Sequence, residues 1–152
     1  MYAYYIGDNS DWINRLSCCL NCQIMVFNNP LKTILCINEQ SKKDTSPTYI
    51  FIESCNKIQD IQYLDSINKS NLQHTYLLLI SEYIIKENIA DNLHAGASEI
   101  VDINMPAEDL HTTLALLPKL KQYSTAKLQQ HAHRFKLPLW KRIFDLAFSS
   151  AA

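Results

Sequence analysis

The chain has 152 residues, 47% of them hydrophobic, which is enough for one domain with a full core and a modest extension but excludes a second independent domain. Residues 1–117 contain seven Lys and Arg against fourteen Asp and Glu, whereas residues 118–152 contain seven against one. An acidic folded body followed by a basic extension is therefore predicted. Such an extension either seeks phosphate, on nucleic acid or on anionic lipid, or is simply a solvated basic helix.

The cysteines predict reduced thiols in a cytoplasmic protein. The apolar stretch at the amino end is short and is interrupted by Asp8, so a secretory signal peptide is not expected. Cys19 and Cys22 have the spacing of half a redox or zinc site, but no second Cys or His pair stands at ligand spacing. We interpret them, with Cys18, as small apolar fillers.

The first half of the chain alternates short apolar runs with amphipathic stretches. In order, it predicts a strand at Tyr2–Ile6, a helix capped by Ser10 or Asp11, a strand at 23–27, a helix beginning at Asn29-Pro30, a strand at 49–52 and a helix at 57–70. The apolar positions of these helices are Ile13, Leu16 and Leu20, then Leu31, Ile34 and Leu35, then Ile58, Ile61, Leu64 and Ile67. Steps of three and four residues predict one apolar face for each helix.

The second half continues the alternation. It predicts a strand at 76–80, a helix at 82–95, a strand at Glu99–Asp102 and a helix beginning at Pro106. The run at 76–80 is nearly all apolar, as in a central strand covered on both faces. The apolar helix positions are Ile85, Ile89 and Leu93 in the first helix, which Gly96 would end, and Leu110, Leu114 and Leu117 in the second.

Five strands are each followed by a helix, and this order predicts an α/β fold. We expect a five-stranded parallel sheet with helices on both faces, connected by right-handed crossovers. Residues 1–117 would form this domain, residues 118–134 a polar basic linker, and residues 135–152 an amphipathic helical tail. Ligands of such sheets bind at the carboxyl ends of the strands, so the residues there are the candidates for a site.

Over residues 1–117 this order resembles the receiver domains of two-component response regulators, which have a flavodoxin-like fold. The stretch Ala95-Gly96-Ala97-Ser98-Glu99-Ile100-Val101 is similar to that family's Ala-Gly-Ala passage into its last strand. The resemblance implies an acidic pair after the first strand to hold Mg²⁺, a phosphate-accepting Asp after the third, a Ser or Thr after the fourth and a Lys after the fifth. Hard oxygen ligands suit the metal, and the Lys neutralises the transferred charge.

Only part of this set is present. Gly7-Asp8 falls at the acidic pair, so one carboxylate is missing; Glu53 falls at the acceptor position, and Ser81 matches the hydroxyl position. The Lys position falls on Ile103 or Asn104, and the stretch between Lys86 and Lys119 contains no Lys or Arg. Because acceptor, carboxylate and Lys are altered together, we predict a pseudo-receiver with vestigial positions Asp8, Glu53 and Ser81 and no phosphotransfer.

Glu53 has two further interpretations. Its carboxylate, one methylene further out than that of Asp, imitates a permanently phosphorylated acceptor, or it is simply a solvated acid at the end of a strand. Other chemistries lack their residues: His131 and His133 have no acidic neighbour, and Gly7 and Gly96 are the only glycines, so no Gly-rich phosphate loop is possible. We predict no catalytic residue, metal, cofactor or small-molecule substrate within these 152 residues.

The extension becomes apolar near its end. Trp140, Ile143, Phe144, Ala147 and Phe148 fall on one helical face, after Lys136, Lys141 and Arg142. Basic residues and a Trp before an apolar helix favour the membrane–water interface, and Lys136, Trp140, Lys141, Arg142 and Phe144 are the candidates for contact with anionic lipid. The alternative is an amphipathic helix that docks on the domain or on a partner.

The stretch Pro138-Leu139-Trp140-Lys141-Arg142-Ile143-Phe144-Asp145-Leu146 resembles the opening of bacterial sugar transferases that move a sugar phosphate from a nucleotide sugar onto a polyprenyl-phosphate carrier. The resemblance covers about twelve residues and does not reach that family's catalytic carboxylates. It implies a regulatory or docking module at the N-terminus of a membrane-bound sugar-phosphate transferase for capsule or exopolysaccharide synthesis. We expect a protein partner or self-association at the inner face of the cytoplasmic membrane.

The alternative is a free-standing signalling adaptor that binds a kinase or a transcription partner through its helical face, with a basic tail that contacts nucleic acid. A nucleic-acid partner is not predicted, because the extension lacks a helix-turn-helix or zinc pattern and has too few spaced basic residues for a groove-reading helix.

Overall fold

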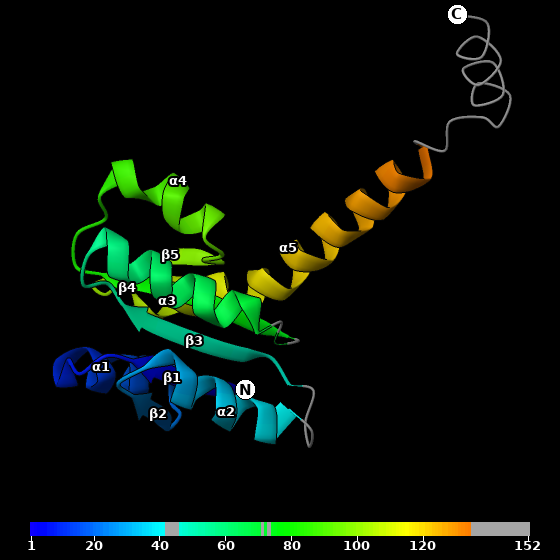
Figure 1. Cartoon of the computed structure of the whole chain (residues 1–152). Coiled ribbons are helices and arrows are strands. Elements are labelled where there is room, and N and C mark those ends of the chain that lie inside the picture. Colours follow the sequence, from blue (N-terminus) through cyan, green and yellow to red (C-terminus); the bar gives the residue numbers. More distant parts are fainter. Residues whose placement is uncertain (42–45, 71, 73, 135–152) are drawn as a thin grey trace, which may run out of the picture. The chain divides into compact units, whose positions relative to one another are not determined.

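The computed structural model describes residues 1–41, 46–70, 72 and 74–134, in which strands and helices alternate along the chain (Figure 1). The elements are β1 Tyr2–Ile6, α1 Ser10–Leu20, β2 Ile24–Phe27, α2 Pro30–Ser41, β3 Thr48–Glu53, α3 Lys57–Lys69, β4 Thr75–Ser81, α4 Lys86–His94, β5 Glu99–Asp102 and α5 Ala107–Arg134. The sheet lies in a compact unit that spans Met1–Pro118.

The five strands form one parallel sheet in the order β2-β1-β3-β4-β5. This confirms the predicted five-stranded parallel sheet of a flavodoxin-like, receiver-like fold. The chain goes from β1 to β2 on one side and continues through β3, β4 and β5 on the other. The direction of winding therefore reverses between β1 and β3, and the crevice at the carboxyl ends of these two strands is the place where such sheets bind ligands.

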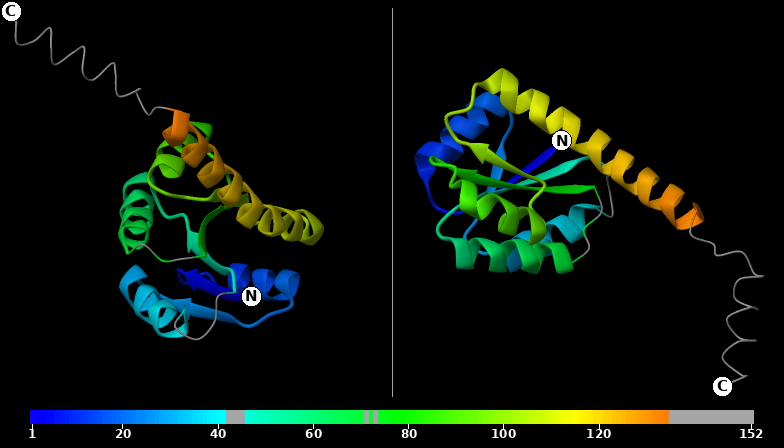
Figure 2. Two further views of the ribbon diagram at one scale, coloured as in Figure 1. Left: turned by 90° about the vertical axis from the view of Figure 1, so that its right-hand side faces the viewer. Right: turned by 90° about the horizontal axis from the view of Figure 1, so that it is seen from above.

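Helices cover both faces of the sheet, with α1 and the start of α5 on one face and α2, α3 and α4 on the other (Figure 2). Alternate residues of each strand point to opposite faces, so the sheet contributes to two separate cores. The first core contains Tyr5, Phe51, Leu78, Ile80 and Val101 from the strands, Leu16 and Leu20 from α1, and Leu110, Leu114 and Leu117 from α5. The second contains Tyr4, Ile6, Ile50, Ile52 and Leu79 from the strands, Ile37 from α2, and Leu64 and Ile67 from α3.

The predicted apolar faces hold for α1 and α5 and for most of α3, where Leu64 and Ile67 are buried, but only partly for α2 and not for α4. On α2, Leu31 and Leu35 are 69% and 66% exposed, whereas Thr33 and Ile37 are buried. Ile58 of α3 is also exposed, as are Ile85 before α4 and Leu93 within it. Buried polar residues, Thr33, Asp60 and Asn92, take the inward positions on these helices.

Helix α4 begins four residues later than predicted. Its N-cap is Ile85, whose side chain makes no capping hydrogen bond, and the Ser81 hydroxyl instead stabilises a loop by bonding to the backbone of Tyr83. The predicted helix end is confirmed, because Gly96 follows the C-cap Ala95 with a φ of +113°. Helix α1 is capped by Asn9, one residue before the predicted cap.

Helix α5 continues through Pro118 to Arg134, so the segment 118–134 has a helical backbone. No helix in the described part of the chain is both long and apolar enough to span a bilayer. The candidate membrane-interface residues Lys136, Trp140, Lys141, Arg142 and Phe144 lie outside the described residues.

Candidate functional site

The candidate residues lie at one edge of the sheet, because parallel strands end on the same side. Asp8 follows β1, Glu53 ends β3, Ser81 ends β4, and Ile103 follows β5. Strand register aligns these ends: Ile6 lies beside Ile52, Glu53 beside Ile80, and Ser81 beside Asp102. The edge therefore brings together the positions that correspond to the phosphorylation site of a receiver.

Glu53 does not extend freely into solvent. Its Oε2 accepts hydrogen bonds from the Tyr5 hydroxyl at 2.9 Å, from the Asp8 backbone N–H at 3.0 Å and from the Asn9 backbone N–H at 3.1 Å. Backbone N–H groups at the start of a helix form a favourable environment for an anion. One carboxylate oxygen of the protein itself thus occupies the crevice between β1 and β3.

Gly7 makes room for this carboxylate. Its φ is +151°, and a Cβ at this position would lie 2.2 Å from Glu53 Oε2 and 2.8 Å from Tyr5 Cε1. Any side chain would therefore be strained by the backbone conformation and would clash with Glu53. The missing acidic residue at position 7 and the Glu at position 53 are parts of one arrangement.

Hydrogen bonds of Asn9 connect the loop after Gly7 to Glu53 on one side and to the start of α1 on the other. Asn9 donates its N–H to Glu53, and its side-chain Oδ1 accepts from the N–H groups of Asp11 and Trp12 at the start of α1. Asp8 is exposed, so only its backbone takes part in the arrangement.

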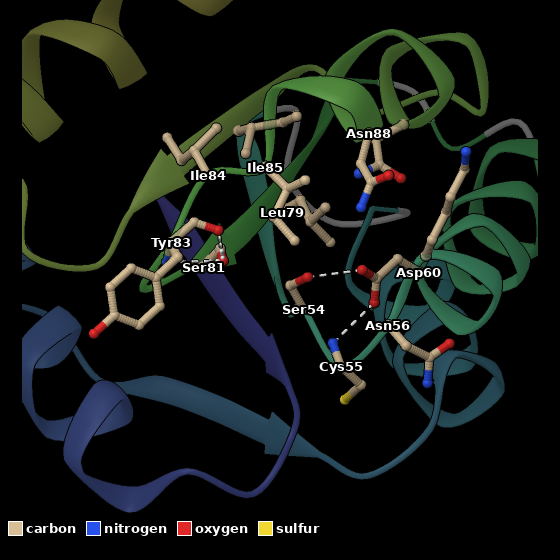
Figure 3. Close-up of a pocket in the computed structure, with 13 residues that line it drawn as sticks. Ser54, Cys55, Asn56, Asp60, Leu79, Ser81, Tyr83, Ile84, Ile85 and Asn88 are labelled. Carbon is tan, nitrogen blue, oxygen red and sulfur yellow. Dashed lines mark hydrogen bonds between the residues drawn. The ribbon is translucent and has the colours of Figure 1, made fainter.

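Ser81 is engaged within its own loop. Its hydroxyl donates to the Tyr83 carbonyl at 2.7 Å and accepts from the Tyr83 N–H at 3.2 Å (Figure 3). The structure thus uses this hydroxyl to shape the connection between β4 and α4.

At the end of β5, where the resemblance implies a Lys, the backbone accepts hydrogen bonds from a cation on another helix. Ile103 is buried and Asn104 is exposed, and the carbonyls of both accept hydrogen bonds from the Arg15 guanidinium, at 2.6 Å from Nε and 3.2 Å from Nη2. Sequence reasoning missed Arg15, whose one signal is that it is the only basic residue among the first 31. It ties α1 to the β5–α5 loop.

The electrostatics of the edge keep its weak acids protonated. Burial raises the pKa of the Tyr5 hydroxyl, and the hydrogen bond to Glu53 raises it further, so Tyr5 remains a donor. Partial burial and then the charges of Glu53, Asp60 and Asp8 raise the pKa of the Cys55 thiol, which disfavours the nucleophilic thiolate. Within the described ranges, no group of three or more His, Cys, Asp or Glu is arranged to hold a metal ion.

Comparison with known proteins supports the fold. No protein-family model matches the chain, and no curated protein matches it. Among solved structures, a CheY-like protein (tadZ) from Pseudomonas aeruginosa PAO1 superimposes with a TM-score of 0.61 at 12% identity, over 77% of this chain and 94% of that one. A yeast Spc42 trimeric coiled-coil segment fused to another structure gives a TM-score of 0.61 at 10% identity over 99% of both chains. The chain therefore has a CheY-like receiver fold.

Proposed function

We propose that residues 1–117 form a pseudo-receiver, a docking or regulatory module that does not take up a phosphoryl group. The observation that carries this proposal is the Glu53 carboxylate, held by three hydrogen bonds in the crevice where a receiver binds metal and phosphate. The hydrogen bonds hold the β1–α1 loop without a ligand. Glu53 thus acts as a built-in anion that fixes this edge in one state.

The residues around Glu53 agree with this role. Formation of an acyl phosphate through Glu53 Oε1 would turn Oε2 into a neutral carbonyl oxygen and weaken its hydrogen bonds to Tyr5, Asp8 and Asn9. The developing charge would then lie near the exposed carboxylate of Asp8. At the β5 end, where a receiver has Lys, the described residues offer the buried Ile103 and the Arg15 guanidinium, which already donates to the carbonyls of Ile103 and Asn104. Electrostatic stabilisation of transferred phosphate needs cationic groups at that point.

A receiver-like module that does not take up phosphate can still act by binding other proteins. The segment that leads into α4 exposes three consecutive apolar side chains: Tyr83 is 76% exposed, Ile84 41% and Ile85 57%. Exposed apolar side chains gathered in one place are typical of surfaces that bind other proteins. We propose that the module binds a protein partner or a second copy of itself through its helices.

The setting that we propose is the N-terminus of a membrane-bound sugar-phosphate transferase for capsule or exopolysaccharide synthesis, at the inner face of the cytoplasmic membrane. This part rests on sequence alone: the resemblance of Pro138–Leu146 and the seven basic residues against one acidic residue in 118–152. The second candidate is a free-standing signalling adaptor, which the exposed apolar residues near α4 support equally well.

Incubation with a small phosphodonor tests the central part of the proposal. The full chain and its Glu53→Gln variant are treated with acetyl phosphate and Mg²⁺, and intact masses are measured before and after acid treatment. We expect no phosphoryl group on either protein. An acid-labile phosphate on the unmodified chain that is missing from Glu53→Gln would identify an active receiver and overturn the proposal.

A further inference from the structure

A cavity of about 440 Å³ lies beside the Glu53 site, one strand further along the sheet (Figure 3). It is lined by the end of β3 and the start of α3, by Leu79 of β4 and Ile100 of β5, and by the loop and helix that follow β4. Its volume is within the roughly 300–1,000 Å³ of small-molecule sites. Its place at the carboxyl ends of parallel strands is also where such sheets bind ligands.

The cavity contains a buried acceptor without a partner. Asn92 on α4 lines the cavity and is 4% exposed, and its Oδ1 has no hydrogen-bond partner among the residues that the structure describes. A buried acceptor left unpaired is costly. A donor that occupies the cavity would therefore pair with it.

A buried carboxylate is a second acceptor at the cavity. Asp60 is 2% exposed, and its two carboxylate oxygens accept from the Ser54 hydroxyl at 2.7 Å and from the Cys55 N–H at 3.0 Å. A carboxylate has lone pairs for further donors. Asn88 lines the cavity one turn before Asn92 and adds a second carboxamide.

This polarity disfavours an anion. Lys57 Nζ, the cation among the lining residues, is bound to Asp91 Oδ2 at 2.5 Å. The start of α3 is capped by the Asn56 side chain, which accepts from the Gln59 N–H. A phosphate would thus meet the Asp60 carboxylate without a free cation to balance it.

The remaining lining is apolar, from Leu79, Ile84, Ile85 and Ile100. A ligand that complements both parts of the lining has an apolar body and at least one N–H donor. A carboxamide pairs well with an amino group beside a ring nitrogen, as Asn does with adenine.

We propose that this cavity binds a neutral heteroaromatic amine of nucleobase size, whose exocyclic amino group donates to Asn92 Oδ1 while its ring packs against Leu79 and Ile100. The site is separate from the Glu53 crevice, and the proposal does not depend on the docking role of the module.

The test compares two ligands that differ by one group. 9-Methyladenine and 9-methylpurine, which lacks the amino group, are titrated into the full chain and followed by two-dimensional amide NMR; the methyl group removes the ring N–H from both ligands. We expect saturable binding of 9-methyladenine with shifts at the cavity residues, and at least tenfold weaker binding of 9-methylpurine, since it has no N–H to donate to Asn92 Oδ1. Equal affinities, shifts away from the cavity, or no saturable binding of 9-methyladenine at millimolar concentration would overturn the proposal and leave water as the occupant.

Variants provide a second comparison. Asn92→Leu should weaken 9-methyladenine binding at least tenfold, whereas the same change at the exposed Asn14 on α1 should leave it unchanged. Asn92→Asp keeps the acceptor for the amino group but loses the N–H that pairs with the ring nitrogen, so it should retain part of the binding. This keeps the test valid if Asn92→Leu does not fold. Unchanged 9-methyladenine affinity in Asn92→Leu, or complete loss of binding in a folded Asn92→Asp, would contradict the assignment.

Discussion

At the residue scale, Glu53 Oε2 joins three segments of chain through the Tyr5 hydroxyl and the N–H groups of Asp8 and Asn9. Hydrogen bonds to a charged acceptor are stronger than neutral ones, and a buried member left unpaired costs more than it contributes when paired. Gly7 is required for the same arrangement, since a Cβ there would overlap Oε2. A substitution at any of these positions should therefore disturb the hydrogen bonds of the others.

Tyr5 predicts how stability depends on pH. Its pKa is raised in the folded protein above the ordinary value of 10.0 by burial and then by Glu53. Below pH 10 the hydroxyl is protonated in both folded and unfolded chains, so its contribution is complete. Above that pH the unfolded chain loses a proton that folded Tyr5 keeps, and the free energy of unfolding falls.

Tyr5→Phe should therefore lower the free energy of unfolding by about 1–2 kcal/mol at pH 7. Above pH 10 its stability should fall less steeply than that of the unmodified chain, by up to about 1.4 kcal/mol per pH unit for the one proton removed. Urea unfolding between pH 7 and pH 11 measures both effects. Parallel curves for the two proteins above pH 10 would refute the assignment of the raised pKa to Tyr5.

The sequence predicts where the residues of the candidate site lie, but not which contacts their side chains make. Strand ends alone place Asp8, Glu53 and Ser81 at one edge, because parallel strands finish on the same side. The direction of the Glu53 carboxylate, the return of the Ser81 hydroxyl to Tyr83, and the Arg15 contact with Ile103 are not readable in this way. They depend on side-chain conformation and on residues far apart in the chain.

At the scale of elements, the strands were predictable because short runs of apolar residues between polar turns indicate buried strands. The inward faces of α1 and α5 were predictable for the same reason, as Leu16, Leu20, Leu110 and Leu114 are buried. On α2, α3 and α4, polar residues occupy inward positions. Thr33 forms a hydrogen bond to the Asn29 carbonyl, and Asp60 accepts hydrogen bonds from Ser54 and Cys55. Hydrophobic periodicity was therefore misleading for α2 and α4, where Leu31, Leu35 and Leu93 are exposed, but it identified the buried Leu64 and Ile67 of α3.

Helix α2 allows these faces to be tested. Leu31→Ala and Leu35→Ala should each change the free energy of unfolding by no more than about 0.5 kcal/mol, because both side chains are exposed. Ile37→Ala should cost about 2–4 kcal/mol, because Ile37 is 2% exposed and packed in the second core. Chemical denaturation of the three variants gives the comparison. Losses of similar size at Leu31 and Ile37 would show that the helix presents another face to the sheet.

At the scale of the whole molecule, charge divides the chain into an acidic part and a basic part. Residues 118–152 carry seven basic residues against one acidic residue, and the proposal assigns their end to an anionic lipid surface. Each Lys or Arg near such a surface contributes about 1 kcal/mol, and the attraction falls with ionic strength.

The full chain should therefore bind phosphatidylglycerol vesicles in a salt-sensitive way, and phosphatidylcholine vesicles weakly. Lys141→Glu with Arg142→Glu should reduce this binding by roughly tenfold or more, since two attractive charges become repulsive. Lys32→Glu on α2 is the matched control and should have little effect. If the chain bound duplex DNA and not the vesicles, this would favour the free-standing signalling adaptor over the module of a membrane-bound transferase.

The most direct test of the account is amide hydrogen exchange at Asp8 and Asn9, because their N–H groups hold Glu53 in the crevice. We predict that both amides are protected, that Mg²⁺ and acetyl phosphate leave their exchange rates and NMR shifts unchanged, and that Glu53→Ala exposes them. Rapid exchange of both amides in the unmodified chain, or a change in them on addition of Mg²⁺ and phosphodonor, would contradict a crevice already filled by Glu53.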